Sequence, residues 1–185
     1  MADYRRECDQ CSYTIPERHR RCSLRTCERF PYCWIHMKKV YGLVVKTSGI
    51  RNAGLGLFFM GYKKPNGAMV DALRIGSTVT HYSSETLTNN ADYNAKYGDA
   101  DTDYGFLTNG GWLMDSGSTM NFPGRLINDA HGTRKHNNVA FPSNRAKPRF
   151  NAEFGRFTIP IKAIRRINAG DELFIRYGAA YWEED

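Results

Sequence analysis

Residues 170–182 read Gly-Asp-Glu-Leu-Phe-Ile-Arg-Tyr-Gly-Ala-Ala-Tyr-Trp. Gly170-Asp171 is typical of a turn, and Leu173-Phe174-Ile175 is a short apolar run of the kind that forms a buried strand. Tyr177-Gly178 ends that strand and leaves a phenol at its end, with Tyr181 and Trp182 following. Taken alone, the stretch predicts a last core strand capped by aromatic side chains. Its meaning depends on the motifs that precede it.

The chain has 185 residues, enough for one well-buried domain and a small appendage. No apolar run has the length of a membrane span, and the first residues lack the core of a signal peptide. We therefore expect an intracellular protein of the nucleus or cytoplasm, with no membrane partner. The net charge of +7 permits contact with nucleic acid, and arginines concentrate near the N-terminus.

All five cysteines lie in the first part of the chain, and a histidine stands three positions after the last of them. In a chain without a secretory signal, such a cluster indicates metal binding more often than disulfide bonding. Structural zinc takes four sulfur or imidazole ligands in a tetrahedron. Cys33 and His36 supply one close pair, and the second pair stays open. It could be Cys8 with Cys11, Cys11 with Cys22, or Cys22 with Cys27.

The remainder of the sequence predicts a mostly β domain with little helix. Short apolar or alternating runs bounded by glycine and polar turns are typical of short strands. Residues 89–98 are the one segment here that favours a short helix ended by a glycine. Pro160 places its strand at a sheet edge or a bulge. The predicted strands cover 43–45, 53–59, 78–82, 104–107, 112–115, 139–141 and 157–163.

Several motifs from about residue 43 to residue 182 together resemble a SET domain, the fold of protein lysine methyltransferases. Ala53–Phe58 matches its Gly-x-Gly-Leu-Phe opening, and Tyr82–Glu85 resembles its Tyr-x-Gly-Glu with serine in place of glycine. Arg125–Asn128 matches the start of its Arg-Phe-Ile-Asn-His-Ser-Cys-x-Pro-Asn segment, and Asn138–Phe141 matches the end. Gly170–Gly178 matches its Gly-Glu-Glu-Leu…Tyr-Gly close. The order and spacing of the motifs carry the resemblance.

The resemblance implies a β-rich α+β fold of several small sheets with a knot-like C-terminal crossing at 42–182. A small zinc-binding module at 1–41 would precede it, as in some viral and protist SET proteins. That pattern favours Cys11, Cys22, Cys33 and His36 as ligands, with Cys8 and Cys27 as alternatives.

The chain departs from the family pattern in two places. Asp129-Ala130-His131 replaces the usual His-Ser-Cys, and four extra residues precede Asn137-Asn138. No cysteine follows Tyr177, so the zinc-bound flap that closes the site in many family members is missing, and Tyr181 and Trp182 stand in its place.

The implied activity is transfer of a methyl group from S-adenosylmethionine to a protein lysine, with a histone tail in chromatin as the expected substrate. Tyr177 would be the catalytic residue. Backbone and side chains that would bind the cofactor are Ala53, Gly54, Leu55, Gly56, Asn128, Asp129 and Trp182. Candidates for the lysine channel are Tyr82, Tyr104, Ile175 and Tyr181. His81, His131 and His136 are interpreted as surface or turn residues.

A second hypothesis makes the protein a catalytically degenerate SET fold that serves as a binding module. The departure at Asp129-Ala130-His131 motivates it, because the usual histidine is missing from the cofactor segment. Arg18, Arg20 and Arg21 would then tether the module to nucleic acid or chromatin.

Overall fold

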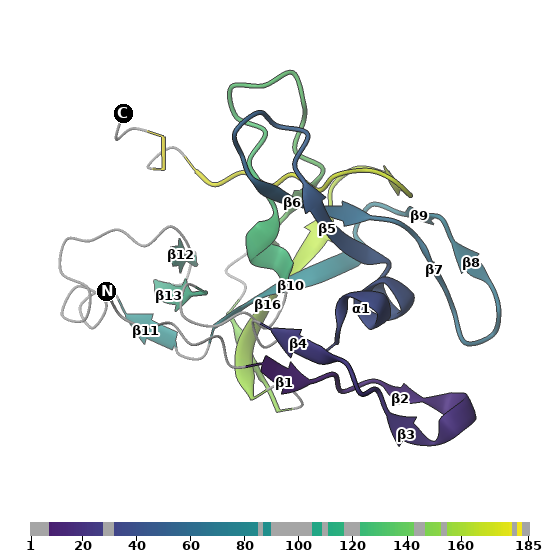
Figure 1. Ribbon diagram of the computed structural model, residues 1–185. Helices are drawn as coiled ribbons and strands as arrows, with labels where there is room; N and C mark the ends of the chain where they lie inside the picture. The colour runs from purple at the N-terminus through teal and green to yellow at the C-terminus, as the bar shows by residue number, and fades with distance from the viewer. Residues whose placement is uncertain are drawn as a thin grey trace.

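The computed structural model describes residues 8–27, 32–84, 87–89, 105–108, 111–116, 123–142, 147–152, 155–178 and 181–182 (Figure 1). Within this part of the chain, no helix combines the length and apolar character needed to cross a membrane. The strands form several small sheets around one core, which confirms the predicted β-rich architecture. The boundary at residue 41 between the predicted zinc-binding module and the predicted domain at 42–182 stays a prediction.

The N-terminal module consists of two small antiparallel ladders and one helix. β1 (Cys8–Gln10) pairs with β4 (Arg25–Cys27), and β2 (Thr14–Ile15) pairs with β3 (Arg20–Arg21). The 3-10 helix η1 (Pro16–Arg18) closes the second hairpin, with a proline in its first turn where no backbone donor is needed. Helix α1 (Trp34–Tyr41) follows and ends at Gly42, which is left-handed at φ 69°.

The largest sheet is antiparallel and has β16 (Arg156–Ala163) inside it. β10 (Thr78–Ser84) pairs along one side, while β14 (Val139–Ala140) and β15 (Arg149–Asn151) pair along the other. The sequence predicts a sheet edge or a bulge at Pro160. β16 is not an edge strand, because it has partners on both sides, and the register between β10 and β16 shifts between Thr78 and Thr80, opposite Lys162 and Ile161. On its second side β16 pairs through 156–158 and 162–163, so Pro160 falls between two short partners and its missing N–H interrupts neither ladder.

Smaller pairings surround this sheet. β5 (Leu43–Thr47) pairs with β6 (Leu55–Phe59), β7 (Tyr62–Lys63) with β8 (Met69–Val70), and β9 (Ala72–Leu73) with β17 (Ile167–Asn168). β13 (Trp112–Asp115) lies between β11 (Leu87–Asn89) and β12 (Gly105–Leu107), and η2 (Pro123–Leu126) precedes the site. The helix predicted at 89–98 lies outside the described residues apart from Asn89, which ends β11.

The main core joins most of the elements that follow the N-terminal module, and apolar side chains from distant parts of the sequence meet in it. The buried cysteines of the module form a separate cluster. Leu57 and Phe59 of β6 are fully buried, as are Ile161 of β16 and Leu173 near the C-terminus. Burial of this kind contributes roughly 1.5–3 kcal/mol for each large apolar side chain. The core includes Ile127 and Ile175, so the two motif segments that contain them, Arg125–Asn128 and Gly170–Gly178, are packed against the same interior.

Candidate functional site

The C-terminal segment 170–177 lies between β6 and the loop 127–139, as the predicted crossing requires. Toward β6, Leu173 N donates to Leu57 O at 2.8 Å, and an isolated bridge joins Phe58 to Glu172. Toward the loop, Ile175 N donates to Asn128 O at 2.9 Å, and a parallel bridge joins Asn128 to Phe174. Figure 1 shows this yellow segment passing beside β6 and the green loop.

Two asparagine side chains hold the crossing together. Asn138 Nδ2 donates to Glu172 O at 2.8 Å, and its Oδ1 accepts from Phe174 N at 2.8 Å. The Asn138 side-chain amide therefore pairs with the backbone of the C-terminal segment as a neighbouring strand would. Asn128 Nδ2 donates to Leu55 O at 2.9 Å. The glycine-rich turn, the 127–139 loop and the C-terminal segment therefore form one hydrogen-bonded unit.

The glycines of the Gly-x-Gly motif are needed for two different reasons. Gly54 adopts φ +66°, and an added Cβ would meet nothing within 4 Å. At Gly56, an added Cβ would lie 2.2 Å from Glu172 Oε1. The buried Glu172 carboxylate accepts from Ser48 Oγ at 2.6 Å and from Gly49 N at 2.8 Å. Gly56 thus makes room for a carboxylate of the protein itself, a contact that the sequence prediction of cofactor binding did not anticipate.

Tyr177 stands at the end of the crossing with its phenol partly exposed. Its hydroxyl donates to Ile127 O at 2.9 Å, which fixes the direction of the O–H bond. The Tyr177 ring contacts Tyr181 edge-on at 4.8 Å between centroids, and it lies nearly parallel to Trp182 at 6.5 Å. Tyr181 and Trp182 also contact each other edge-on at 5.0 Å. The structure therefore brings the three predicted C-terminal aromatics into one group.

A cavity of about 540 Å³ opens beside this group, between the 129–137 loop and the end of the chain. This volume is within the usual range for small-molecule sites. Its wall is amphipathic, since it is lined both by the Trp182 ring and by the side chains of Lys135 and Arg176. Lys135 also places its Nζ 5.5 Å from the centre of the Phe174 ring. The lining residues are Asp129, Ala130, His131, Lys135, His136, Asn137, Arg176, Gly178 and Trp182.

The candidate channel residues have different surroundings. Tyr82 is buried in the main core, where its ring contacts Phe106 and Phe141 edge-on. Ile175 is buried in the same core. Tyr181 is half exposed beside Tyr177. Tyr104 lies outside the described residues.

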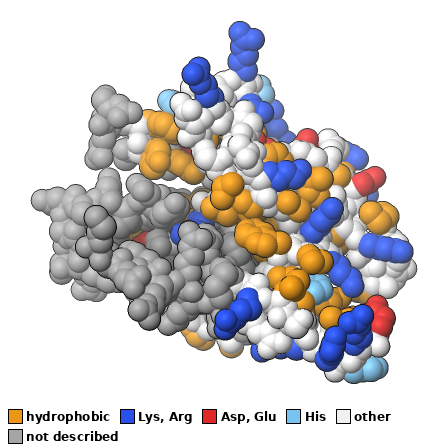
Figure 2. Space-filling model, in the orientation of Figure 1, with side chains coloured by type: hydrophobic (Ala, Val, Ile, Leu, Met, Phe, Trp, Pro, Cys, Tyr) orange, Lys and Arg blue, Asp and Glu red, His pale blue; other side chains and the backbone are white. Residues whose placement is uncertain are grey.

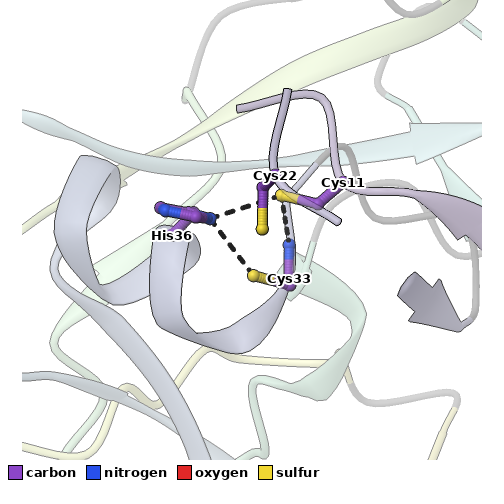
Figure 3. A group of neighbouring side chains, drawn as sticks. All are labelled: Cys11, Cys22, Cys33 and His36. Atoms are coloured by element: carbon purple, nitrogen blue, oxygen red, sulfur yellow. Dashed lines mark hydrogen bonds between the residues drawn. The ribbon is translucent and has the colours of Figure 1, made fainter. Parts of the chain in front are cut away.

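The second site is the cysteine and histidine group of the N-terminal module. Cys11, Cys22, Cys33 and His36 are all buried, and their ligand atoms all lie within 4.8 Å of one another (Figure 3). His36 Nδ1 lies 3.4 Å from Cys11 Sγ and 3.2 Å from Cys33 Sγ. A tetrahedral zinc ion with standard bond lengths requires ligand separations of about 3.6 Å between sulfur and nitrogen. The four donors therefore fit zinc in both chemical type and spacing.

Local structure explains how these four ligands come together. Cys33 is the N-cap of α1 and His36 lies in the first turn, so both face the same side of the helix. The hairpins deliver Cys11, whose N donates to Leu24 O, and Cys22, whose N donates to Tyr13 O. Arg21 braces this arrangement, since its Nε donates to Cys11 O at 2.9 Å. Cys8 and Cys27 are register partners across β1 and β4, and their side chains lie outside the described part.

Burial shifts the pKa of two of these residues, His36 and Cys33. It lowers the pKa of His36 below 6.5, and the Lys39 cation lowers that pKa further. Burial also raises the pKa of the Cys33 thiol, and the neighbouring cysteines act in the same direction. Tyr13 stacks on His36 at 3.9 Å and covers the imidazole from solvent. A metal cation is the partner that would stabilise deprotonated thiols here.

Sequence reasoning missed several residues of the crossing and the cavity. His131 lies in a turn and His136 is exposed, as interpreted, but both also line the cavity together with Lys135 and Arg176. The interpretation of His81 as a surface or turn residue is wrong, because His81 lies within β10 and is partly buried. The basic run 134–136 within the four-residue insertion was the available signal. Glu172 and Asn138 act through contacts to residues more than 30 positions away, which no local pattern reveals.

No protein-family model matches the chain, and no curated protein matches it. Among solved structures, the chain is similar to one chain of "ctPRC2 in an autoinhibited conformation bound to S-adenosylmethionine", at 22% sequence identity and a TM-score of 0.47. The match covers 75% of this chain and 15% of that chain, so the protein spans less than a fifth of its length. The site assignments therefore rest on the contacts described above.

Proposed function

We propose that the protein is an S-adenosylmethionine-dependent protein-lysine N-methyltransferase with a structural zinc ion in its N-terminal module. The observation that supports this best is the crossing, which joins the Gly-x-Gly turn, Asn128 and Tyr177 beside a cavity of about 540 Å³. These are the segments whose order along the sequence resembles the SET family.

The cavity suits the cofactor in size and in chemistry. The Trp182 ring offers a face for stacking a purine, while Lys135 and Arg176 offer cations for a carboxylate. When bound, S-adenosylmethionine would supply an electrophilic methyl group on a positively charged sulfur. Backbone from Ala53 to Gly56 would contact it from the neighbouring turn.

Tyr177 would orient the reacting groups through its phenol oxygen. Because the hydroxyl hydrogen is donated to Ile127 O, an incoming amine would meet the acceptor side of that oxygen. The same oxygen could accept weak hydrogen bonds from polarised C–H groups. A lysine must arrive uncharged, and the rings of Tyr177 and Tyr181 would lower its pKa by excluding water. In-line alignment would then supply a large part of the rate enhancement.

The test is methyl transfer onto whole histones and onto cell extract, with cofactor binding measured separately by calorimetry. We expect Tyr177→Phe to lower the rate by roughly 100-fold or more while cofactor binding changes little. Tyr62→Phe is the matched control, because it removes a phenol oxygen from β7 outside the site. Absence of both cofactor binding and transfer, or full activity of Tyr177→Phe, would refute the proposal.

A binding-module function is the second candidate, and the basic hairpin favours it. Arg18 and Arg20 are exposed at the end of the β2–β3 hairpin, and Figure 2 shows basic side chains gathered on that side of the module. Arg21 is different, because its guanidinium binds backbone carbonyls and Ser12 Oγ. Neutralising Arg18 and Arg20 should weaken binding to a DNA duplex and reduce its salt dependence. Unchanged binding would exclude the hairpin as the contact.

A further inference from the structure

Trp182 forms part of the cavity wall, yet it lies beyond Gly178, where the backbone turns at φ +116° and leaves the crossing. A side chain at such a position needs specific contacts if it is to shape a binding site. Besides its ring contacts with Tyr177 and Tyr181, Trp182 makes a hydrogen bond and a stacking contact to the segment 129–131. This segment is where the chain departs from the His-Ser-Cys of the family pattern.

Asp129 supplies the polar contacts. Its Oδ2 accepts from Tyr177 N at 2.8 Å and from Trp182 Nε1 at 3.2 Å, while its Oδ1 accepts from His131 N at 3.0 Å. The carboxylate is buried, so these donors replace water. One side chain therefore joins the start of the cavity loop, the backbone of the proposed catalytic tyrosine and the indole of Trp182. Hydrogen bonds to a buried charge are stronger than those between neutral groups.

His131 supplies the apolar contact. Its ring stacks on Trp182 with centroids 4.7 Å apart and planes 21° apart. The hydrogen bond from His131 N to Asp129 Oδ1 fixes the backbone that carries this ring. Trp182 is thus held at its N–H by a carboxylate and on its face by an imidazole, and both partners come from one three-residue segment.

We propose that Asp129 and His131 are positioning residues that hold Trp182 as a preformed wall of the cavity. The departure from the family pattern at 129–131 thus supplies both side chains that hold this wall. Only the identity of the ligand in this proposal rests on the proposed function. The positions of Trp182 and of the Tyr177 amide can be tested without any ligand.

The first experiment measures the free protein. In a Trp34→Phe/Trp112→Phe background, Trp182 is the only tryptophan. We expect Asp129→Ala and His131→Ala to increase quenching of its fluorescence by acrylamide severalfold. Asp129→Ala should also accelerate hydrogen exchange at the Tyr177 amide at least tenfold, since alanine has no side-chain oxygen that accepts from this N–H. Asp71→Ala is the control, with the same charge change at an exposed position. Quenching and exchange equal to those of the parent protein would overturn the proposal.

The second experiment measures S-adenosylmethionine binding in the full chain. Asp129→Ala and Trp182→Ala should each raise Kd roughly tenfold, and the double variant should be no weaker than Trp182→Ala alone, because both remove the same wall. In turnover assays the loss should fall on the KM for the cofactor, with kcat changed less. Multiplicative losses in the double variant would overturn the coupling of the two residues. Failure of the parent protein to bind the cofactor would instead refute the proposed function, and the quenching result would still stand.

Discussion

Replacing Gly56 with alanine should strongly destabilise the protein, and the cause should be Glu172. The new Cβ would lie 2.2 Å from Glu172 Oε1 and 3.1 Å from its carboxyl carbon, well inside van der Waals contact. The carboxylate would have to leave its position, and it would lose the hydrogen bonds from Ser48 Oγ and Gly49 N. The backbone of β6 cannot yield instead, because it is paired with β5 and with the C-terminal segment.

The magnitude follows from the two hydrogen bonds. A hydrogen bond to a charged group contributes about 1.5–3 kcal/mol, so losing both should lower the free energy of unfolding by about 3 kcal/mol or more. This is a large fraction of the roughly 5–15 kcal/mol that stabilises a typical domain. Glu172→Ala should cost a similar amount by removing the same two bonds. In the double variant the added methyl fits the vacated space, so its cost should be close to that of Glu172→Ala alone.

Urea unfolding of the four proteins in this cycle measures the coupling. Gly54→Ala is the matched control, since its Cβ meets nothing and its cost of roughly 1–2 kcal/mol comes only from the left-handed backbone. Its effect should add to that of Glu172→Ala. If Gly56→Ala and Glu172→Ala are also additive, the glycine is not required by the carboxylate and this reasoning fails.

Three further predictions concern the metal, the crossing and pH. Chelation should remove one zinc ion per chain and lower the Tm. The Cys33→Ser variant should contain less than one zinc ion per chain by elemental analysis. A protein that is purified without zinc and is unaffected by chelators would contradict the zinc site. Asn138→Ala should lower the free energy of unfolding by about 2–3 kcal/mol, because the hydrogen bonds to Glu172 O and Phe174 N are lost. A change below about 0.5 kcal/mol, as surface substitutions give, would show that water replaces these two hydrogen bonds. Burial lowers the pKa of His81 below 6.5, so as pH falls the unfolded chain binds a proton before the folded chain does, and the free energy of unfolding should decrease below about pH 6.5. His81→Gln should reduce this pH dependence in urea unfolding. An unchanged dependence would exclude His81 as its source.

The sequence predicted those features that depend on local patterns. Strands such as β13 (Trp112–Asp115) and β6 (Leu55–Phe59) were expected from alternation or apolar runs, and they occur where expected. The cluster of Cys11, Cys22, Cys33 and His36 was also expected once the family pattern was considered, and the structure brings those four together. Spacing alone had left the second ligand pair open, because the hairpins between the cysteines decide which sulfurs meet.

The features that escaped prediction depend on partners distant in sequence. Pro160 predicted a sheet edge or a bulge, and the structure contradicts the edge, because on one side of β16 this residue lies in a gap between two short partners inside the sheet. Gly56 was predicted to contact the cofactor, and the structure shows that the Glu172 carboxylate occupies the space beside its α-carbon. Asp129 was predicted to bind the cofactor, which stays a prediction, and its carboxylate accepts hydrogen bonds from Tyr177 N and Trp182 Nε1, which the sequence did not indicate. Each of these side chains has a role that only the assembled chain defines.

The hydrogen bonds of the crossing also determine when the site can form during folding. Ser48 and Glu172 are 124 residues apart in sequence, Leu55 and Asn128 are 73 apart, and Asp129 and Tyr177 are 48 apart. Contacts of such high sequence separation close long loops, and folding slows as they dominate a structure. The metal module, with ligands 25 residues apart at most, can assemble early. We expect amide protection around Tyr177 to appear last in refolding, so an incompletely folded chain would hold its metal and still lack the site.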